Sequence, residues 1–195
     1  MKSLKNLLSL GVAAALGIAT FASTASAEAP SDVKEIKAIQ DRGVLRVGVK
    51  NDVVGFSVKD PLSGEYTGFE DTLATLIAKE IGEDVEVEFT AVTAATRSEL
   101  IDSGDLDCVL ATFTITPERK KNWDFSTPYY QDAVSVLVEN KSEIHHLKDL
   151  LGKTVGVSSG STSAKALVQA MIDNKILDGK NFNADKFDPS TWTEG

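Results

Sequence analysis

Residues 106–130 read Leu-Asp-Cys-Val-Leu-Ala-Thr-Phe-Thr-Ile-Thr-Pro-Glu-Arg-Lys-Lys-Asn-Trp-Asp-Phe-Ser-Thr-Pro-Tyr-Tyr, an apolar strand that runs into a polar turn. The apolar run 107–111 is typical of a parallel strand covered on both faces. The Thr-Pro-Glu triplet at 116–118 has the pattern of a helix start. Thr114 and Arg119 are thereby predicted at the carboxyl end of a strand, where open α/β sheets bind ligands. Arg119 either binds a carboxylate through two hydrogen bonds or lies solvated on a helix surface.

The segments on either side of this stretch alternate between strand and helix patterns. Period-two and 3.6-residue apolar spacings predict the upstream elements. These are a helix at 33–41, a strand at 44–50, a hairpin that pairs 56–58 with 66–69, a helix at 70–81, a strand at 85–89 and a helix at 94–103. The β-α-β-α-β order predicts a parallel sheet with right-handed crossovers. Downstream, strands at 133–138 and 154–158 and a helix at 162–174 begin a second α/β unit.

The first 27 residues are typical of a secretory signal peptide. Lys2 and Lys5 precede an apolar stretch, and Ala25-Ser26-Ala27 offers a cleavage site before Glu28. The apolar stretch is shorter than the ~20 residues that cross a bilayer. The single cysteine, Cys108, lies in the predicted strand, so we expect no internal disulfide and no lipid attached at the cleavage site. The predicted location is the periplasm of a two-membrane bacterium.

The chain is acidic, with 20 lysines and arginines against 29 aspartates and glutamates and a net charge of −9. Removal of Lys2 and Lys5 with the signal leaves 18 basic residues and a net charge of −11. This charge disfavours nucleic acid and anionic lipid as partners. Affinity for a small anion must therefore come from a few cations gathered in a cleft.

The runs Thr-Ile-Thr-Pro-Glu-Arg (114–119) and Asp-Phe-Ser-Thr-Pro-Tyr-Tyr (124–130) resemble the signature of the periplasmic polar-amino-acid-binding proteins of ABC importers. The likeness covers about 42–166 and is greatest to the PEB1-type aspartate/glutamate-binding proteins. It implies an α/β, two-lobed, type II Venus-flytrap fold that is C-terminally truncated here. Residues 28–133 would form the first lobe without its usual return segment. Residues 134–195 would supply the crossover strand and the first part of the second lobe.

The same resemblance implies residues that bind the α-carboxylate of an amino acid. Arg119 would bind it directly, with Thr114 and the helix start at Ser161 and Thr162 assisting. The free N–H groups of a helix amino end attract anions, and the alternative is that these residues are ordinary helix caps. Thr112, at the end of the same strand as Thr114, completes this predicted group.

Lys50 and Arg97 are the predicted contacts for a second carboxylate. Lys50 ends the strand at 44–50 and Arg97 lies early in the helix at 94–103, so both should project from one edge of the sheet. The resemblance implies that they neutralise the side chain of aspartate or glutamate; the alternative is that each is a solvated surface residue. Glu70 and Asp71 are interpreted as helix-start acids favoured by the helix dipole. We expect the acid that binds the ligand ammonium beyond residue 195.

Three patterns resemble catalytic or metal motifs more weakly. The Gly-x-Ser-x-Gly run at 156–160 suits a nucleophile elbow, but no histidine follows His146. The Gly-Lys-Thr at 152–154 lacks the first glycine of a phosphate loop, and His145 and His146 have no further metal ligands nearby. The sequence thus predicts no enzyme, no cofactor and no metal, but a monomer that delivers aspartate or glutamate to an inner-membrane ABC permease. A periplasmic cyclohexadienyl (prephenate or arogenate) dehydratase or a ligand-sensing module on the same fold stays open.

Overall fold

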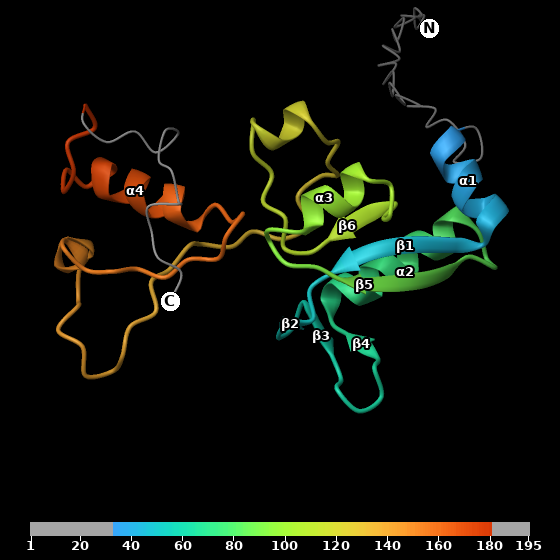
Figure 1. Ribbon diagram of the computed structural model, residues 1–195, viewed down its shortest axis with the longest axis horizontal. Coiled ribbons are helices and arrows are strands. Elements are labelled where there is room, and N and C mark those ends of the chain that lie inside the picture. Colours follow the sequence, from blue (N-terminus) through green and yellow to red (C-terminus); the bar gives the residue numbers. More distant parts are fainter. Residues whose placement is uncertain (1–32, 181–195) are drawn as a thin grey trace, which may run out of the picture.

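The computed structural model describes residues 33–180, and a three-stranded parallel sheet forms the centre of its first part (Figure 1). The strands are β1 (Val44–Val49), β5 (Glu86–Ala91) and β6 (Cys108–Leu110), in the order β5-β1-β6. Val47 of β1 lies opposite both Phe89 and Cys108. β1 is the central strand, and its Val47 and Val49 are fully buried, as its alternating β-branched residues predict.

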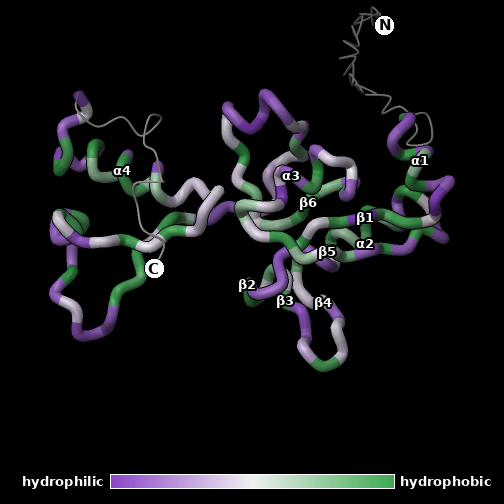
Figure 2. The backbone as a smooth tube through the Cα atoms, in the orientation of Figure 1, coloured by the Kyte–Doolittle hydropathy of each residue, from purple (hydrophilic) through white to green (hydrophobic). Residues whose placement is uncertain are grey.

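Three helices connect and cover these strands: α1 (Lys34–Arg42), α2 (Phe69–Ile81) and α3 (Arg97–Asp102). α2 packs Ala74, Ala78 and Ile81 into one core cluster with the buried side chains of β1. Figure 2 shows hydrophobic stretches in both parts of the chain, with hydrophilic residues between them. The chain therefore runs β1-α2-β5-α3-β6, and the predicted β-α-β-α-β order is confirmed. α3 is shorter than predicted, because Thr93 and Thr96 cap each other's backbone in a turn ahead of it.

A small antiparallel sheet lies between β1 and α2. It consists of β2 (Asp52–Val53), β3 (Ser57–Lys59) and β4 (Tyr66–Thr67), so the predicted hairpin is confirmed and a short strand precedes it. Gly68 ends the hairpin where a Cβ atom would lie 2.1 Å from Phe56 O, so only glycine fits there. This close approach fixes the start of α2 against β3.

Asp107 joins the strands at the amino end of the parallel sheet. Its carboxylate lies 2.9 Å from Arg46 Nη2, accepts a bond from the Arg46 N–H and also pairs with Arg42. Burial raises the pKa of Asp107, but the hydrogen bonds from Arg46 and the charges of both arginines outweigh it and hold the pKa below its usual value. Two arginines thus share one carboxylate at the edge far from the carboxyl ends of the strands.

The second part contains η3 (Leu147–Leu150) and α4 (Ser163–Asp173), which pack Leu150, Leu167 and Met171 together. The predicted helix at 162–174 is confirmed. The predicted strands at 133–138 and 154–158 are wrong for this structure: neither pairs with a strand within residues 33–180, and an unpaired run forms no ladder. In Figure 1 this part lies beside the β1-β5-β6 unit and is joined to it by long stretches without regular structure.

Two further predictions concern helices. The helix start at 116–118 leads to a single 3₁₀ turn, η2 (Arg119–Lys121), in which Thr116 Oγ1 accepts the Arg119 N–H as a cap. Within residues 33–180 no helix combines the length and apolar character needed to cross a bilayer. The predicted signal peptide, 1–27, and the last 15 residues of the predicted second lobe, 181–195, lie outside the described residues.

Candidate ligand-binding site

Two arginines share the ring of Phe113 at the carboxyl end of β6. The guanidinium carbon of Arg97 lies 4.1 Å from the ring centroid, and that of Arg119 lies 4.5 Å from it. Both distances are well within the range of cation–π attraction. The structure thus brings together two of the three predicted cations, although they come from α3 and η2, 22 positions apart in the sequence.

Arg97 is almost completely buried, with 3% of its surface exposed. Its Nη1 donates to Ala111 O at 2.6 Å and to Thr112 O at 3.3 Å, while its Nε has no hydrogen-bond partner among the described residues. Burial, and next the charge of Arg119, lower the pKa of Arg97 to about 10. Arg97 therefore remains charged at neutral pH, and it is not the solvated surface residue of the alternative interpretation.

Arg119 connects the two parts of the chain. Its Nη1 donates to Thr114 O at 2.8 Å and its Nη2 donates to Gly160 O at 2.9 Å. Gly160 has a φ of 71°, and a Cβ atom there would lie 2.5 Å from Ala94 O. The backbones before α3 and before α4 thus meet at Gly160, and Arg119 spans this contact. Burial lowers the pKa of Arg119 as well.

A hydrogen bond joins Glu70 to Thr112, the residue before Phe113, where the chain turns after β6. Thr112 has a φ of 49°, which is unusual for a non-glycine residue, and its N–H donates to Glu70 Oε1 at 2.7 Å. The Tyr129 hydroxyl donates to the same oxygen at 2.8 Å, and Glu70 is fully buried. Glu70 lies in the first turn of α2, as predicted for a helix-start acid, and it also fixes the turn that follows β6.

Lys50 follows β1 at the same edge of the sheet. Val49 pairs with Leu110, so Lys50 leaves β1 where β6 passes into the Thr112 turn. Its Nζ lies 3.7 Å from Asp52 Oδ1, and only 16% of its side chain is exposed. The Ser57 hydroxyl lies 2.5 Å from Lys50 O. The third predicted cation thus shares the edge with the other two, although its ammonium is engaged by an exposed acid.

Ser161 and Thr162 lie at the start of α4, beside Gly160. The Ser161 hydroxyl accepts the Ser163 N–H at 3.3 Å, and Thr162 is the N-cap without a side-chain cap bond. Arg119 reaches the carbonyl immediately before these residues. The helix start is therefore close to the arginine, as the predicted carboxylate site requires.

The electrostatic character of this cluster is distinctive. Among residues 33–180, neither Arg97 nor Arg119 lies within 4.0 Å of a carboxylate, whereas Arg42 and Arg46 both pair with Asp107. The chain has nine more acids than bases, so acidic partners are not scarce. The charge of Arg119 lowers the pKa of Arg97 and that of Glu70 raises it, but no carboxylate of the described residues forms an ion pair with either guanidinium group, so the two adjacent cations favour a bound anion. No group of three metal-ligating side chains occurs in the described part of the chain.

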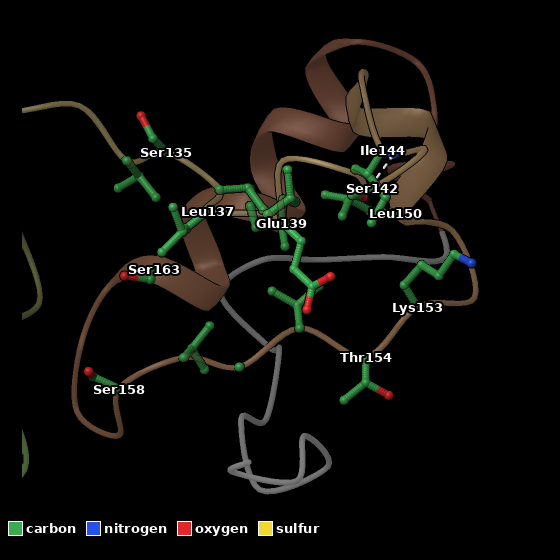
Figure 3. A pocket seen from close by; sticks show the side chains of 17 residues that line it. Ser135, Leu137, Glu139, Ser142, Ile144, Leu150, Lys153, Thr154, Ser158 and Ser163 are labelled. Carbon is green, nitrogen blue, oxygen red and sulfur yellow. Dashed lines mark hydrogen bonds between the residues drawn. The ribbon is translucent and has the colours of Figure 1, made fainter.

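A separate hollow of about 630 Å³ lies between α4 and the two unpaired runs (Figure 3). Apolar side chains such as Val136, Val155 and Leu167 line much of it. Figure 3 shows Leu137 and Ser163 at one side, and Lys153 and Thr154 at another. Arg97 and Arg119 are not among its lining residues, so this hollow is not the cationic site.

The chain matches known proteins over most of its length. Residues 45–183 match the family described as bacterial extracellular solute-binding proteins, family 3. The chain belongs to this family. A glutamine-binding protein of Geobacillus stearothermophilus is 37% identical over 159 residues, which make up 80% of this chain and 61% of that protein. The chain thus spans about three fifths of the length of the curated relatives it matches.

Solved structures agree on the fold. The cysteine-binding protein from Campylobacter jejuni gives a TM-score of 0.64 at 35% identity over 73% of this chain and 56% of its own. The ancestral amino acid-binding protein AncCDT-1, a precursor of cyclohexadienyl dehydratase, gives 0.54 at 43% identity over 59% and 51%. The predicted two-lobed α/β fold of periplasmic binding proteins is therefore confirmed.

Sequence reasoning missed three residues of the site. Phe113 lies between Thr112 and Thr114, and its place between two flanking polar residues gave no sign that two cations would share its ring. Gly160 was seen only as part of the Gly-x-Ser-x-Gly run, although its positive φ is the property that glycine supplies. Glu70 could have been found only from its burial, which a local pattern at a helix start does not reveal.

Proposed function

We propose that this chain is the ligand-binding part of a periplasmic solute-binding protein that captures aspartate or glutamate for an ABC importer. The observation that carries the proposal is the pair of guanidinium groups on Phe113, neither of which has a carboxylate within 4.0 Å among the described residues. An amino-acid carboxylate would supply the missing negative charge. Family membership supports the amino-acid class, since the matched relatives are named for glutamine, cystine and arginine.

In this proposal Arg119 binds the α-carboxylate and Thr114 and Thr112 line the site. Arg119 already orients its guanidinium through Thr114 O and Gly160 O, which leaves its remaining N–H groups for a ligand. Ser161 and Thr162 add the amino end of α4 from the second lobe. Binding therefore bridges the two lobes and shifts the population toward a closed form, which an inner-membrane permease would recognise.

The side-chain carboxylate is assigned to Arg97 and Lys50. Arg97 offers a buried Nε with no partner in the described structure, and a charged donor left unpaired inside a protein is costly. Lys50 lies at the same edge and would exchange Asp52 for the ligand. Two cations for one side chain favour aspartate and glutamate over their amides. Glutamine, the ligand named for a relative, is the second candidate.

The direct test is calorimetric titration of the full-length protein and an Arg119→Ala variant with aspartate. Loss of two charged hydrogen bonds, each at the low end of 1.5–3 kcal/mol, should weaken binding by roughly 100-fold or more. Lys120→Ala is the matched control, because it removes a neighbouring positive charge from the same 3₁₀ turn. Equal affinities for Arg119→Ala and the control would reject the assignment.

A dehydratase remains the alternative on this fold because of the likeness to AncCDT-1. Incubation of the purified full-length protein with prephenate or arogenate separates the two functions. A binding protein leaves both compounds unchanged, whereas an enzyme releases water and carbon dioxide from them with multiple turnovers.

A further inference from the structure

Ser57 lies at a buried junction behind the candidate site. Its Oγ is 2.5 Å from Lys50 O and 2.7 Å from Asp71 Oδ1. Ser57 is fully buried and Asp71 is 4% exposed. One hydroxyl thus connects the end of β1 to the first turn of α2, in a place that bulk water does not reach.

The number of protons at this junction decides which of its groups must donate a hydrogen bond. A serine hydroxyl has one proton to donate, and a backbone carbonyl can only accept. An ionised aspartate can also only accept. If Asp71 were a carboxylate, Ser57 could donate to one neighbour alone, and the other oxygen would face it lone pair to lone pair at 2.5 or 2.7 Å. Those separations are typical of O–H···O hydrogen bonds and require a proton in each gap.

We propose that Asp71 is a protonated carboxylic acid in the folded protein, donating to Ser57, which in turn donates to Lys50 O and so positions the Lys50 end of β1. Both gaps then contain one proton, and each acceptor has a donor. Asp71 and Ser57 are positioning residues, because both lie behind Lys50 and act through it. Only this last step rests on the proposed function; the protonation of Asp71 does not.

The surroundings of Asp71 favour its neutral form. Burial raises its pKa, and the contact with Ser57 opposes that shift. The nearby charged groups have other contacts: Lys50 faces Asp52 of β2, Lys59 of β3 lies over Tyr66 of β4, and Glu70 accepts from Thr112 and Tyr129. The strands beneath α2 contribute apolar side chains and the Cys108 thiol to the core.

Asp71 Oδ2 agrees with this description. It is buried without a hydrogen-bond partner among the described residues. A buried oxygen without a hydrogen-bond partner costs far more free energy on a carboxylate than on a neutral acid, because the charge of the carboxylate would lie unsolvated. The first turn of α2 therefore contains two buried acids in different roles, an acceptor at Glu70 and a donor at Asp71.

Carbon NMR of the full-length protein labelled with ¹³C-carboxyl aspartate tests the protonation. The Asp71 signal, assigned by its absence in Asp71→Asn, should keep the position of a protonated acid at pH 7. Asp60 is the internal control, because bonds from the backbone of Ser63 and Leu62 lower its pKa and its signal should be that of a carboxylate. An Asp71 signal at the carboxylate position at pH 7 would overturn the proposal.

Ligand titration tests the positioning role. Asp71→Asn keeps a donor for Ser57 and should restore aspartate binding to within about twofold, whereas Asp71→Ala should weaken it about fivefold, the effect of one net hydrogen bond. Equal affinities for the two variants would exclude positioning through the hydrogen bond. If the parent protein binds no acidic amino acid, the proposed function fails, while the carbon spectrum still decides the protonation.

Discussion

Substitution of Gly160 tests whether the contact between the two lobes contributes to binding. Gly160 and Gly152 have φ values of 71° and 72°, so alanine meets the same backbone strain of about 1–2 kcal/mol at either position. At Gly152 nothing lies within 4 Å of the added Cβ, but at Gly160 that atom would be 2.5 Å from Ala94 O and 3.0 Å from Ala95 Cα. The pair of variants therefore separates strain from collision.

The collision should displace Gly160 O from Arg119 Nη2. That bond joins a charged donor to a carbonyl across 2.9 Å and is exposed to solvent, so we take the low end of its range, about 1.5 kcal/mol. This corresponds to a roughly tenfold loss of affinity for aspartate. Calorimetry of the full-length protein measures binding, and urea unfolding measures the stability of both variants.

Gly152→Ala should lose stability and keep its affinity within about twofold, because it lies away from the site. Gly160→Ala should lose a similar or larger amount of stability and bind more weakly. If the two variants bound aspartate equally well, the contact at Gly160 would have no part in ligand capture.

Three predictions concern the charged groups of the first lobe. Arg97→Met should reduce the free energy of unfolding in urea by about 2–4 kcal/mol, because Ala111 O and Thr112 O lose a charged donor and Phe113 loses a cation; an unchanged midpoint would contradict those contacts. Asp107→Asn should be less stable than the parent at pH 7 by about 1–3 kcal/mol, since a native pKa below the unfolded value of about 3.9 stabilises the fold above that pH. The difference should fade as the pH falls through the native pKa of Asp107, and a constant gap in thermal unfolding between pH 2 and pH 7 would refute it. The pH dependence expected for Asp71 has the opposite sign, because its native pKa is raised. The parent should therefore lose stability relative to Asp71→Asn as the pH rises above about 4. The loss should be at most about 1.4 kcal/mol per pH unit and should stop once the native pKa is passed. Parallel pH profiles of the two proteins would exclude a raised pKa.

The first lobe could be predicted from sequence where apolar periodicity and local turns decide the structure. β1, α2 and β5 follow the expected pattern, because their buried side chains recur at the spacing of a strand or a helix. The hairpin of β3 and β4 follows from the turn around Asp60, whose carboxylate accepts the N–H groups of Leu62 and Ser63.

The predictions failed where structure depends on a distant partner. The run at 133–138 has a strand composition, yet a strand forms only when another strand pairs with it. Thr116 accepts the Arg119 N–H near the predicted start, but the chain leaves helical geometry after one 3₁₀ turn, in which Arg119 turns toward Phe113 and Gly160. Capping residues specify where a helix begins, and they do not specify its length.

The grouping of Arg97 and Arg119 could be predicted from sequence, whereas its geometry could not. The motif and the family resemblance selected Arg97 and Arg119, and the structure places both against Phe113. The burial of Arg97 and its bonds to the backbone could not be predicted, because they depend on the positive φ of Thr112 and on the carboxylate of Glu70 beneath it. Such contacts join residues 14 to 42 positions apart, beyond the reach of a local pattern.

The specificity of the full-length protein is the most direct test of an acidic ligand. Calorimetric titration with aspartate, glutamate, asparagine and glutamine under one buffer condition compares carboxylates with their neutral amides. One additional ionic contact to Arg97 or Lys50 should make each acid bind at least about tenfold more tightly than its amide. Equal or tighter binding of glutamine than of glutamate would contradict the assignment of Arg97 and Lys50 to a second carboxylate.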